Sequence, residues 1–184
     1  MVVKMIETPR LILRQWRDSD YPCFAEMGTN PQVMQYFPNL LSRAESDALI
    51  DRMKLIIETK GWGFWAVELK QNQQFIGFVG LHDQPIQFSF STCVEIGWRL
   101  DQAYWGQGYA SEAANAALDF AFEQLQLNKV VSFTTLENEK SQAVMKKVKM
   151  RKITEFQHPA LASDHPLSRH VLYEISRKEF HNQG

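Results

Sequence analysis

Several features that classify a sequence quickly are scarce in this chain of 184 residues. It has two cysteines, Cys23 and Cys93, which match no metal-binding or redox spacing and are expected to be free thiols in a reducing compartment. The net charge of -1 provides no basic footprint for a nucleic acid. No apolar run approaches the roughly 18 residues of a spanning helix. We therefore expect a cytoplasmic protein with no nucleic-acid and no membrane partner.

The remaining composition is that of an ordinary globular domain. Hydrophobic residues make up 45% and charged residues 22% of the chain, and the length fits a single domain over residues 1–184. Twelve Phe, five Trp and five Tyr predict aromatic walls in the core or in a pocket. His158, His165 and His170 share one region, but their spacing fits no metal pattern, so we expect no metal site.

A glycine-containing turn stands between an expected strand and an expected helix. Residues 94–100 alternate as a strand does, and small apolar residues recur at helical spacing over residues 110–125. Between them, W-G-Q-G-Y-A-S fills positions 105–111. Gly106 and Gly108 let such a turn approach a ligand closely, and the free N–H groups of a first helical turn favour a phosphate or pyrophosphate. The alternative is that both glycines only make a tight turn.

Two familiar nucleotide motifs are absent around this turn. No G-x-x-x-x-G-K-S/T occurs, and the longer G-x-G-x-x-G fails because Ser111 stands where its third glycine should be. A nucleotide-binding enzyme is therefore disfavoured. By itself the turn is compatible with a phosphate cradle and with a plain tight turn, and the neighbouring stretches must decide between the two.

The order of expected elements predicts one mixed α/β sheet. The expected strands cover residues 8–15, 64–69, 75–81, 94–100, 129–136, 153–156 and 171–175. The expected helices run from a cap at Asp18 or Ser19 to Met27 with Gly28 as stop, briefly from Asn30-Pro31, from the capping box at 42–45 to Lys60-Gly61, over 110–125, and from Asn138 to about Lys149. The second and third strands form an antiparallel hairpin, and the crossover after the fourth gives a parallel pair. We expect about seven strands with helices on both faces.

Four stretches then carry a resemblance. They are T-P-R-L-I-L-R at 8–14, V-E-I-G-W-R-L at 94–100, Y-W-G-Q-G-Y-A-S-E-A at 104–113, and N-x-x-S at 138–141. Together they resemble the GCN5-related N-acetyltransferase (GNAT) superfamily, and within it the RimJ/RimL branch, which acetylates ribosomal-protein N-termini and related amines. The resemblance implies the GNAT-like acyl-CoA N-acyltransferase fold and acetyl-CoA as acetyl donor.

The resemblance also implies where acetyl-CoA binds. The pyrophosphate would rest on backbone N–H groups from Gly106 to Ala110, and Arg99 and Leu100 would offer main-chain groups to the pantetheine arm. The complete set of expected cofactor-binding residues is Trp98, Arg99, Leu100, Trp105, Gly106, Gln107, Gly108, Tyr109, Ala110, Ser111, Asn138 and Ser141.

Two residues are candidates for the chemistry. Attack on a thioester needs an unprotonated amine, and Glu95 is the candidate general base, directly or through a water. Its alternative is a plain strand carboxylate, solvent-facing or paired with Arg99. Ser141 is the candidate hydrogen-bond donor to the departing sulfur, or else a serine of a first helical turn. Asn138 would hold the pantetheine or a water, and a helix N-cap is compatible with that role.

The sequence departs from the family pattern at three places. Trp105 replaces a polar residue at the start of the cradle, as is usual for the branch. Lys149-Met150 stand where relatives have Gly-Phe, which leaves the geometry of that last helical turn open. Met145 stands where many relatives have a tyrosine acid, and a thioether cannot donate a proton.

The resulting prediction is an acetyl-CoA-dependent N-acetyltransferase that works by direct attack in a ternary complex. The acceptor would be a primary amine, either a protein N-terminus or a small molecule, and the chain would be a monomer or a homodimer. The alternative is a catalytically silent domain of this fold that senses CoA or binds a partner.

Overall fold

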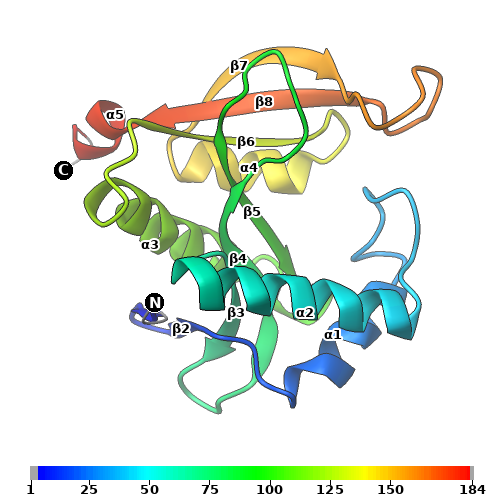
Figure 1. The fold of residues 1–184 in the computed structure, drawn as a ribbon, viewed down its shortest axis with the longest axis vertical. Coiled ribbons are helices and arrows are strands. Elements are labelled where there is room, and N and C mark those ends of the chain that lie inside the picture. The colour runs from blue at the N-terminus through cyan, green and yellow to red at the C-terminus, as the bar shows by residue number, and fades with distance from the viewer. Residues whose placement is uncertain (1–3, 183–184) are drawn as a thin grey trace.

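The structure, a computed structural model, describes residues 4–182 as one eight-stranded sheet with helices packed around it (Figure 1). The strands are β1 (Ile6–Glu7), β2 (Leu11–Arg14), β3 (Phe64–Leu69), β4 (Phe75–Asp83), β5 (Val94–Leu100), β6 (Lys129–Thr135), β7 (Arg151–Gln157) and β8 (Arg169–Ser176). The helices are α1 (Asp20–Thr29), α2 (Arg43–Lys60), a short 3-10 helix (Gln102–Tyr104), α3 (Tyr109–Glu123), α4 (Glu139–Lys147) and α5 (Arg177–His181).

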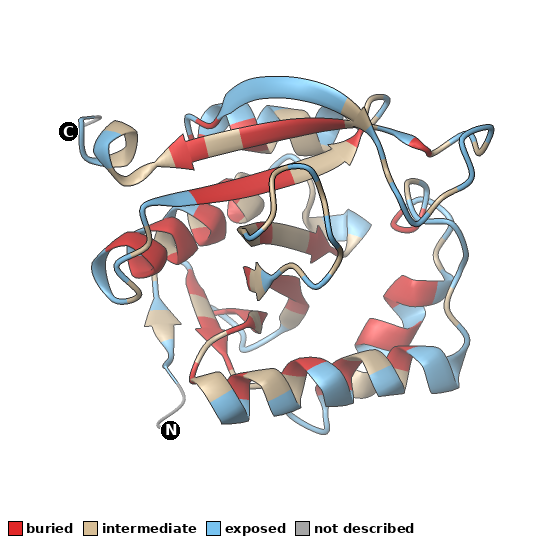
Figure 2. Ribbon diagram, turned by 45° about the horizontal axis from the view of Figure 1, so that its top comes forward, coloured by how far each residue is buried: buried red, intermediate tan, exposed pale blue. Residues whose placement is uncertain are grey.

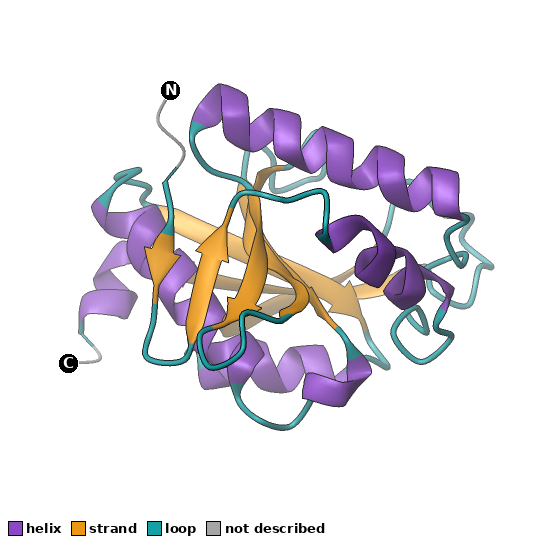
Figure 3. Ribbon diagram, turned by 90° about the horizontal axis from the view of Figure 1, so that it is seen from below, coloured by secondary structure: helices purple, strands orange, loops and turns teal. Residues whose placement is uncertain are grey.

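The expected mixed sheet is confirmed. The strand order is β1-β2-β3-β4-β5-β6-β8-β7, in which β5 and β6 are the parallel pair and the other neighbours are antiparallel. Figure 3 shows α1 and α2 on one face of the sheet and α3 and α4 on the other. The strand bounds at β3 and β5 are those that the alternation predicts.

Several boundaries differ from the expectation for local reasons. The first expected strand is shorter, and an eighth strand, β1, precedes it because a turn at Thr8 and Pro9 folds the chain back into a two-strand pair. Gly28 does not stop α1, which continues to Thr29, and residues 31–36 form turns instead of a helix. Ser19 makes no side-chain cap bond. The sequence reading missed α5, although Ser176 and Glu179 make the S-x-x-E capping box that announces it.

The long helix α2 begins and ends where its sequence predicts. The Ser42 hydroxyl accepts from the Glu45 N–H while the Glu45 side chain accepts from the Ser42 N–H, and Gly61 ends the helix with φ of 82°. Figure 2 shows buried residues along the sides of the helices that face the sheet and exposed residues on their outer sides. Burial of that inner stripe fixes α2 over β3, because apolar side chains gain free energy when removed from water.

A buried ion cluster joins β2, β3 and the start of α1. The Arg14 guanidinium donates to Asp20 Oδ2 at 2.8 Å and to Glu68 Oε2 at 2.6 Å, and Arg17 Nη1 donates to the same Glu68 oxygen at 2.7 Å. Arg14, Asp20 and Glu68 are all buried. Such a cluster fixes geometry because each buried charge depends on its partners.

Glu68→Gln removes the carboxylate that both arginines share. We expect the free energy of unfolding to fall by about 3 kcal/mol, because Arg14 then lies buried with one counter-charge fewer. Urea unfolding followed by circular dichroism measures the change. Glu58→Gln, at an exposed position of α2, is the control and is expected to change stability by about 0.5 kcal/mol or less. Equal small effects of the two substitutions would contradict the stabilising role of the cluster.

Candidate functional site

The parallel strands β5 and β6 separate along most of their length. Their register contains one pair, Glu95 with Val131, and next to it the Ser132 hydroxyl donates to the Ile96 carbonyl at 2.9 Å. Beyond this point β6 no longer pairs with β5, although β4 continues to pair with β5 as far as Leu100. A gap therefore opens along one edge of β5, with Glu95 at its closed end.

The antiparallel pairing with β4 determines which groups face this gap. The N–H of Asp101 bonds to Ile76 and the carbonyl of Cys93 accepts from Gln84, so odd-numbered residues of β5 direct their main-chain groups at β4. Even-numbered residues direct theirs at the gap. The structure thus places the main-chain groups of Trp98 and the N–H of Leu100 at the opening. The main chain of Arg99 faces β4, and the Leu100 carbonyl already accepts from Trp105 Nε1 at 2.9 Å.

The glycine turn lies at the wide end of the gap. Gly106 and Gly108 have φ of 74° and 82°, left-handed values that favour glycine, and Gly108 is the N-cap of α3. The first bond within the helix runs from the Glu112 N–H to the Gly108 carbonyl. The N–H groups of Tyr109, Ala110 and Ser111 are consequently first-turn donors without helical partners, the arrangement that suits an anion.

Arg10, which is distant in sequence, contacts this turn and the start of α3. Its Nη1 donates to the Gln107 carbonyl at 3.0 Å and its Nε to Glu112 Oε2 at 2.6 Å, while its guanidinium lies 4.4 Å from the centre of the Tyr109 ring. Glu112 also accepts from the Thr8 hydroxyl at 2.6 Å. The T-P-R motif therefore orients the cradle, a role that the sequence reading did not assign. The sequence did contain a signal for this role, because T-P-R and Glu112 both lie in stretches that carry the family resemblance, 8–14 and 104–113.

Cationic side chains gather around the cradle. A Cβ built on Gly108 would lie 3.4 Å from Arg10 Nη2 and 3.7 Å from Lys147 Nζ. The Lys140 ammonium lies 4.3 Å from the centre of the Trp105 ring. These charges and the first-turn N–H groups of α3 fit a pyrophosphate. Lys147 was also missed from sequence, because its distance from Gly108 depends on how α4 packs.

A cavity of about 580 Å³ follows the gap and the cradle. It is lined by these expected residues: Trp98, Arg99, Leu100, Trp105, Gly106, Gly108, Tyr109, Ala110, Ser111, Asn138 and Ser141. Gln107 does not line it, since its side chain donates to the Ala103 carbonyl at 3.0 Å. Glu95 does not line it either. The α1–α2 loop adds Gln32, Val33, Gln35 and Tyr36 to the wall.

Asn138 and Ser141 stand where the next strand ends and α4 begins. Asn138 Oδ1 accepts from the Ser141 N–H at 3.2 Å, which confirms the N-cap, and its Nδ2 donates to the Thr134 hydroxyl at 2.9 Å. Within residues 4–182 the Ser141 hydroxyl makes no hydrogen bond. It is therefore free to donate to a group in the cavity.

The end of α4 accommodates its unusual sequence. Lys149 adopts φ of 64°, a left-handed conformation that favours glycine, and Met150 is buried in the core. Met145 is buried as well. The departure at Lys149-Met150 thus leaves the last turn in the geometry that glycine would give, at the cost of a strained residue.

Burial raises the pKa of Glu95 to about 8, and a hydrogen bond from Gln84 Nε2, at 2.6 Å, partly opposes this shift. The bond is to Gln84 and not to Arg99, which lies farther along the same strand. A carboxyl group with this pKa holds a proton near neutral pH and releases it slightly above. That range is appropriate for accepting a proton from an amine.

The chain matches the family described as "Acetyltransferase (GNAT) domain" over residues 10–151. It belongs to the GNAT acetyltransferase family. The relative named "Uncharacterized N-acetyltransferase YnaD", from Bacillus subtilis (strain 168), is 29% identical over 148 residues, which cover 80% of this chain and 82% of that protein. This family membership makes the chain an acetyltransferase.

Solved structures confirm the GNAT fold. A GNAT-family acetyltransferase from Bacillus anthracis superimposes with a TM-score of 0.81 at 24% identity, over 96% of this chain and all of that one. RimJ from Mycobacterium smegmatis, solved with CoA-disulfide, gives a TM-score of 0.76 at 18% identity, over 96% of this chain and 89% of that one. At these identities the likeness concerns the fold alone.

Residues 4–182 contain neither a cluster of metal ligands nor a membrane-spanning helix. No three or more His, Cys, Asp and Glu side chains are grouped so that they could hold a metal ion. Among the helices of the same range, none has the length and apolar character needed to cross a bilayer.

The raised pKa of Glu95 makes stability depend on pH. Between the ordinary glutamate pKa of about 4.3 and about 8, the folded chain holds a proton at Glu95 that the unfolded chain has released. This group therefore lowers stability as pH rises through that window. We expect Glu95→Gln to flatten the decline, measured as the free energy of unfolding in urea at a series of pH values. Glu58→Gln is the control, and curves that stay parallel for Glu95→Gln and the unmodified protein would contradict the shift.

Proposed function

We propose that this chain transfers an acetyl group from acetyl-CoA to a primary amine by direct attack in a ternary complex. The observation that carries the proposal is the gap between β5 and β6, which opens from Glu95 toward a cradle with two left-handed glycines. A ligand with a phosphate-bearing end and a long polar arm fits that shape. When bound, acetyl-CoA supplies an activated acyl group.

The residues divide the binding task along the gap. The N–H groups at the start of α3, with Arg10 and Lys147 nearby, would hold the pyrophosphate. The main-chain groups of Trp98 and the Leu100 N–H would bond the pantetheine amides in place of the missing strand partner. The CoA-disulfide in the RimJ structure supports a CoA ligand on this fold.

Glu95 is proposed as the proton acceptor. It stands at the closed end of the gap, where an arm that starts from the cradle would end, and its pKa of about 8 is close to that of an α-amine, about 7.7–8.0. Proton transfer between groups of similar pKa is nearly free of cost. Because Glu95 does not line the cavity, we assign the transfer to a water between its carboxylate and the amine.

Ser141 is proposed to donate a hydrogen bond to the departing sulfur. Its hydroxyl lines the cavity, and the Asn138 cap fixes the first turn that carries it. Burial raises the pKa of the Cys93 thiol, which argues against an acyl-enzyme on that residue and supports direct attack. A protein N-terminus, as in the RimJ/RimL branch, is the proposed acceptor class.

Gly108→Leu tests the cradle. Its side chain would start between Arg10 and Lys147, so we expect loss of detectable acetyl-CoA binding in calorimetry while the melting temperature shows a folded protein. Gly61→Leu is the matched control, since Gly61 has the same φ of 82° but ends α2 outside the cavity lining. Wild-type affinity in Gly108→Leu would remove the cradle from the site.

Glu95→Gln tests the chemistry. Thiol release is followed with peptides that begin with Ser or Ala and with small amines. For the unmodified enzyme kcat/KM should rise with pH and level off above about 8, and Glu95→Gln should lower the plateau by about 100-fold or more and remove that inflection. An unaltered profile excludes Glu95 as the base. Acetyl-CoA binding with no thiol release from any amine would indicate a silent domain.

A further inference from the structure

The α1–α2 loop covers one end of the cavity. The Tyr36 hydroxyl donates to the Glu137 carbonyl at 3.1 Å, which ties this loop to the segment before α4. Met34, in the same loop, is buried. The glycine cradle lines the same cavity, so a ligand bound at the cradle and a group bound under the loop would share one cavity.

Arg99 lies under this loop with an unusual environment. Its side chain is about nine-tenths buried, and no partner within residues 4–182 accepts from Nε or Nη1. The guanidinium lies 4.1 Å from the centre of the Phe37 ring, 5.5 Å from that of Phe78 and 5.8 Å from that of Phe24. Burial lowers its pKa to about 10, so it still carries a charge at neutral pH.

A comparison with Arg14, another buried arginine, shows that Arg99 lacks a carboxylate partner in the described part of the chain. Arg14 is equally buried but binds two carboxylates, Asp20 and Glu68. Arg99 has three aromatic faces, and none of the residues that line the cavity is an aspartate or a glutamate. Aromatic faces offset only part of the cost of a buried charge, since they leave the N–H donors unbonded. The arrangement therefore has the cation of an ion pair without its anion.

We propose that Arg99 binds a carboxylate carried by the amine acceptor. This inference rests on the proposed function, because the acceptor's amine must reach Glu95. Side chains at 95 and 99 share one face of β5, and their Cα atoms lie about 13 Å apart at the usual rise of a strand. The carboxylate must then be several bonds from the amine, as in an ω-amino acid or a short peptide with a C-terminal or side-chain carboxylate.

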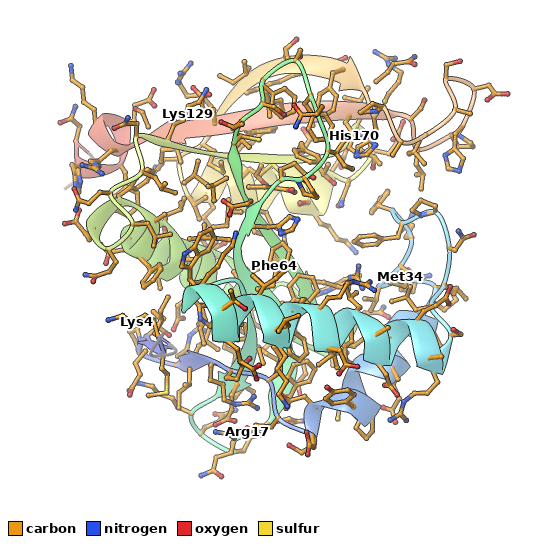
Figure 4. All side chains as sticks on the ribbon, in the orientation of Figure 1. Lys4, Arg17, Met34, Phe64, Lys129 and His170 are labelled. Atoms are coloured by element: carbon orange, nitrogen blue, oxygen red, sulfur yellow. The ribbon has the colours of Figure 1, made fainter. Side chains whose placement is uncertain are left out.

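Aromatic side chains lie between the two residues. Phe64 lies against Gly97, between Glu95 and Arg99, and packs 5.0 Å from the Phe78 ring and 5.4 Å from the His82 ring, measured between centres. Figure 4 shows Phe64 near the middle of the molecule. An aliphatic linker would lie on this aromatic floor with its two charged ends at Glu95 and Arg99. A polyamine would instead bring a second cation to a buried cation.

The test compares ω-amino acids from 4-aminobutyrate to 8-aminooctanoate, each with its own primary amide. In the unmodified enzyme, kcat/KM for thiol release should be about tenfold or more higher for the acid than for the amide at the best length. Arg99→Met should reduce that ratio to near one, and Arg99→Lys should keep part of it. Met fills similar space among the three phenylalanines without a charge, so the variant is expected to fold.

The outcomes separate the inference from the proposed function. Equal rates for acid and amide at every length, or a ratio that Arg99→Met leaves unchanged, would overturn the carboxylate site while acetyl transfer stands. If no amine releases thiol, the proposed function fails. Calorimetry of 6-acetamidohexanoate with the CoA-loaded protein then decides the inference: binding that Arg99→Met abolishes supports it, and equal or absent binding overturns it.

Discussion

The site depends on where the pairing of β5 with β6 ends. Two neighbouring parallel strands normally satisfy each other's main-chain groups along their length. Here one register pair and the Ser132 bond to the Ile96 carbonyl complete the contact, and the Trp98 groups and the Leu100 N–H face open space. Buried or half-buried polar groups of this kind favour any ligand that can replace the absent strand. In the proposed complex, the amides of the pantetheine arm take the place of that strand before any side chain contributes specificity.

One strand serves two tasks because its edges and faces are independent. The edge of β5 toward β6 offers main-chain groups, whereas one of its faces presents the side chains of Glu95 and Arg99. Arg99 is buried and Glu95 is half-buried, and burial has opposite consequences for the two charges. Burial favours the neutral carboxyl at Glu95, and it leaves the Arg99 guanidinium charged without an anion. The first consequence underlies the proposed role of Glu95 as proton acceptor, and the second underlies the proposed carboxylate site at Arg99.

Sequence patterns predicted what depends on nearby residues and missed what depends on packing. The capping box at Ser42, the cap at Asn138 and the alternation over 94–100 are local signals, and the structure confirms them. The resemblance gave the family and eleven of the cavity-lining residues. Two properties of Arg99 could not be predicted from residue spacing. Its lack of a hydrogen-bond acceptor at Nε and Nη1, within the residues that the structure describes, follows from tertiary contacts, and the direction of its main-chain groups follows from strand register. The predicted end of α1 at Gly28 was wrong, because a glycine can continue a helix when packing compensates for its loss of conformational entropy.

The net charge of the chain does not show how its charged side chains are distributed in the fold. The value of -1 argues against a surface for nucleic acids, but it does not describe the cradle, where Arg10, Lys140 and Lys147 gather. Arg10 and Glu112 are 102 residues apart in sequence, and their 2.6 Å bond requires the β1–β2 turn and α3 to be docked. The proposed anion site is therefore assembled only when the β1–β2 pair and α3 are in place. An isolated segment over 104–113 would contain the motif without the charges that surround it, so the proposed phosphate binding requires the folded domain and not the motif alone.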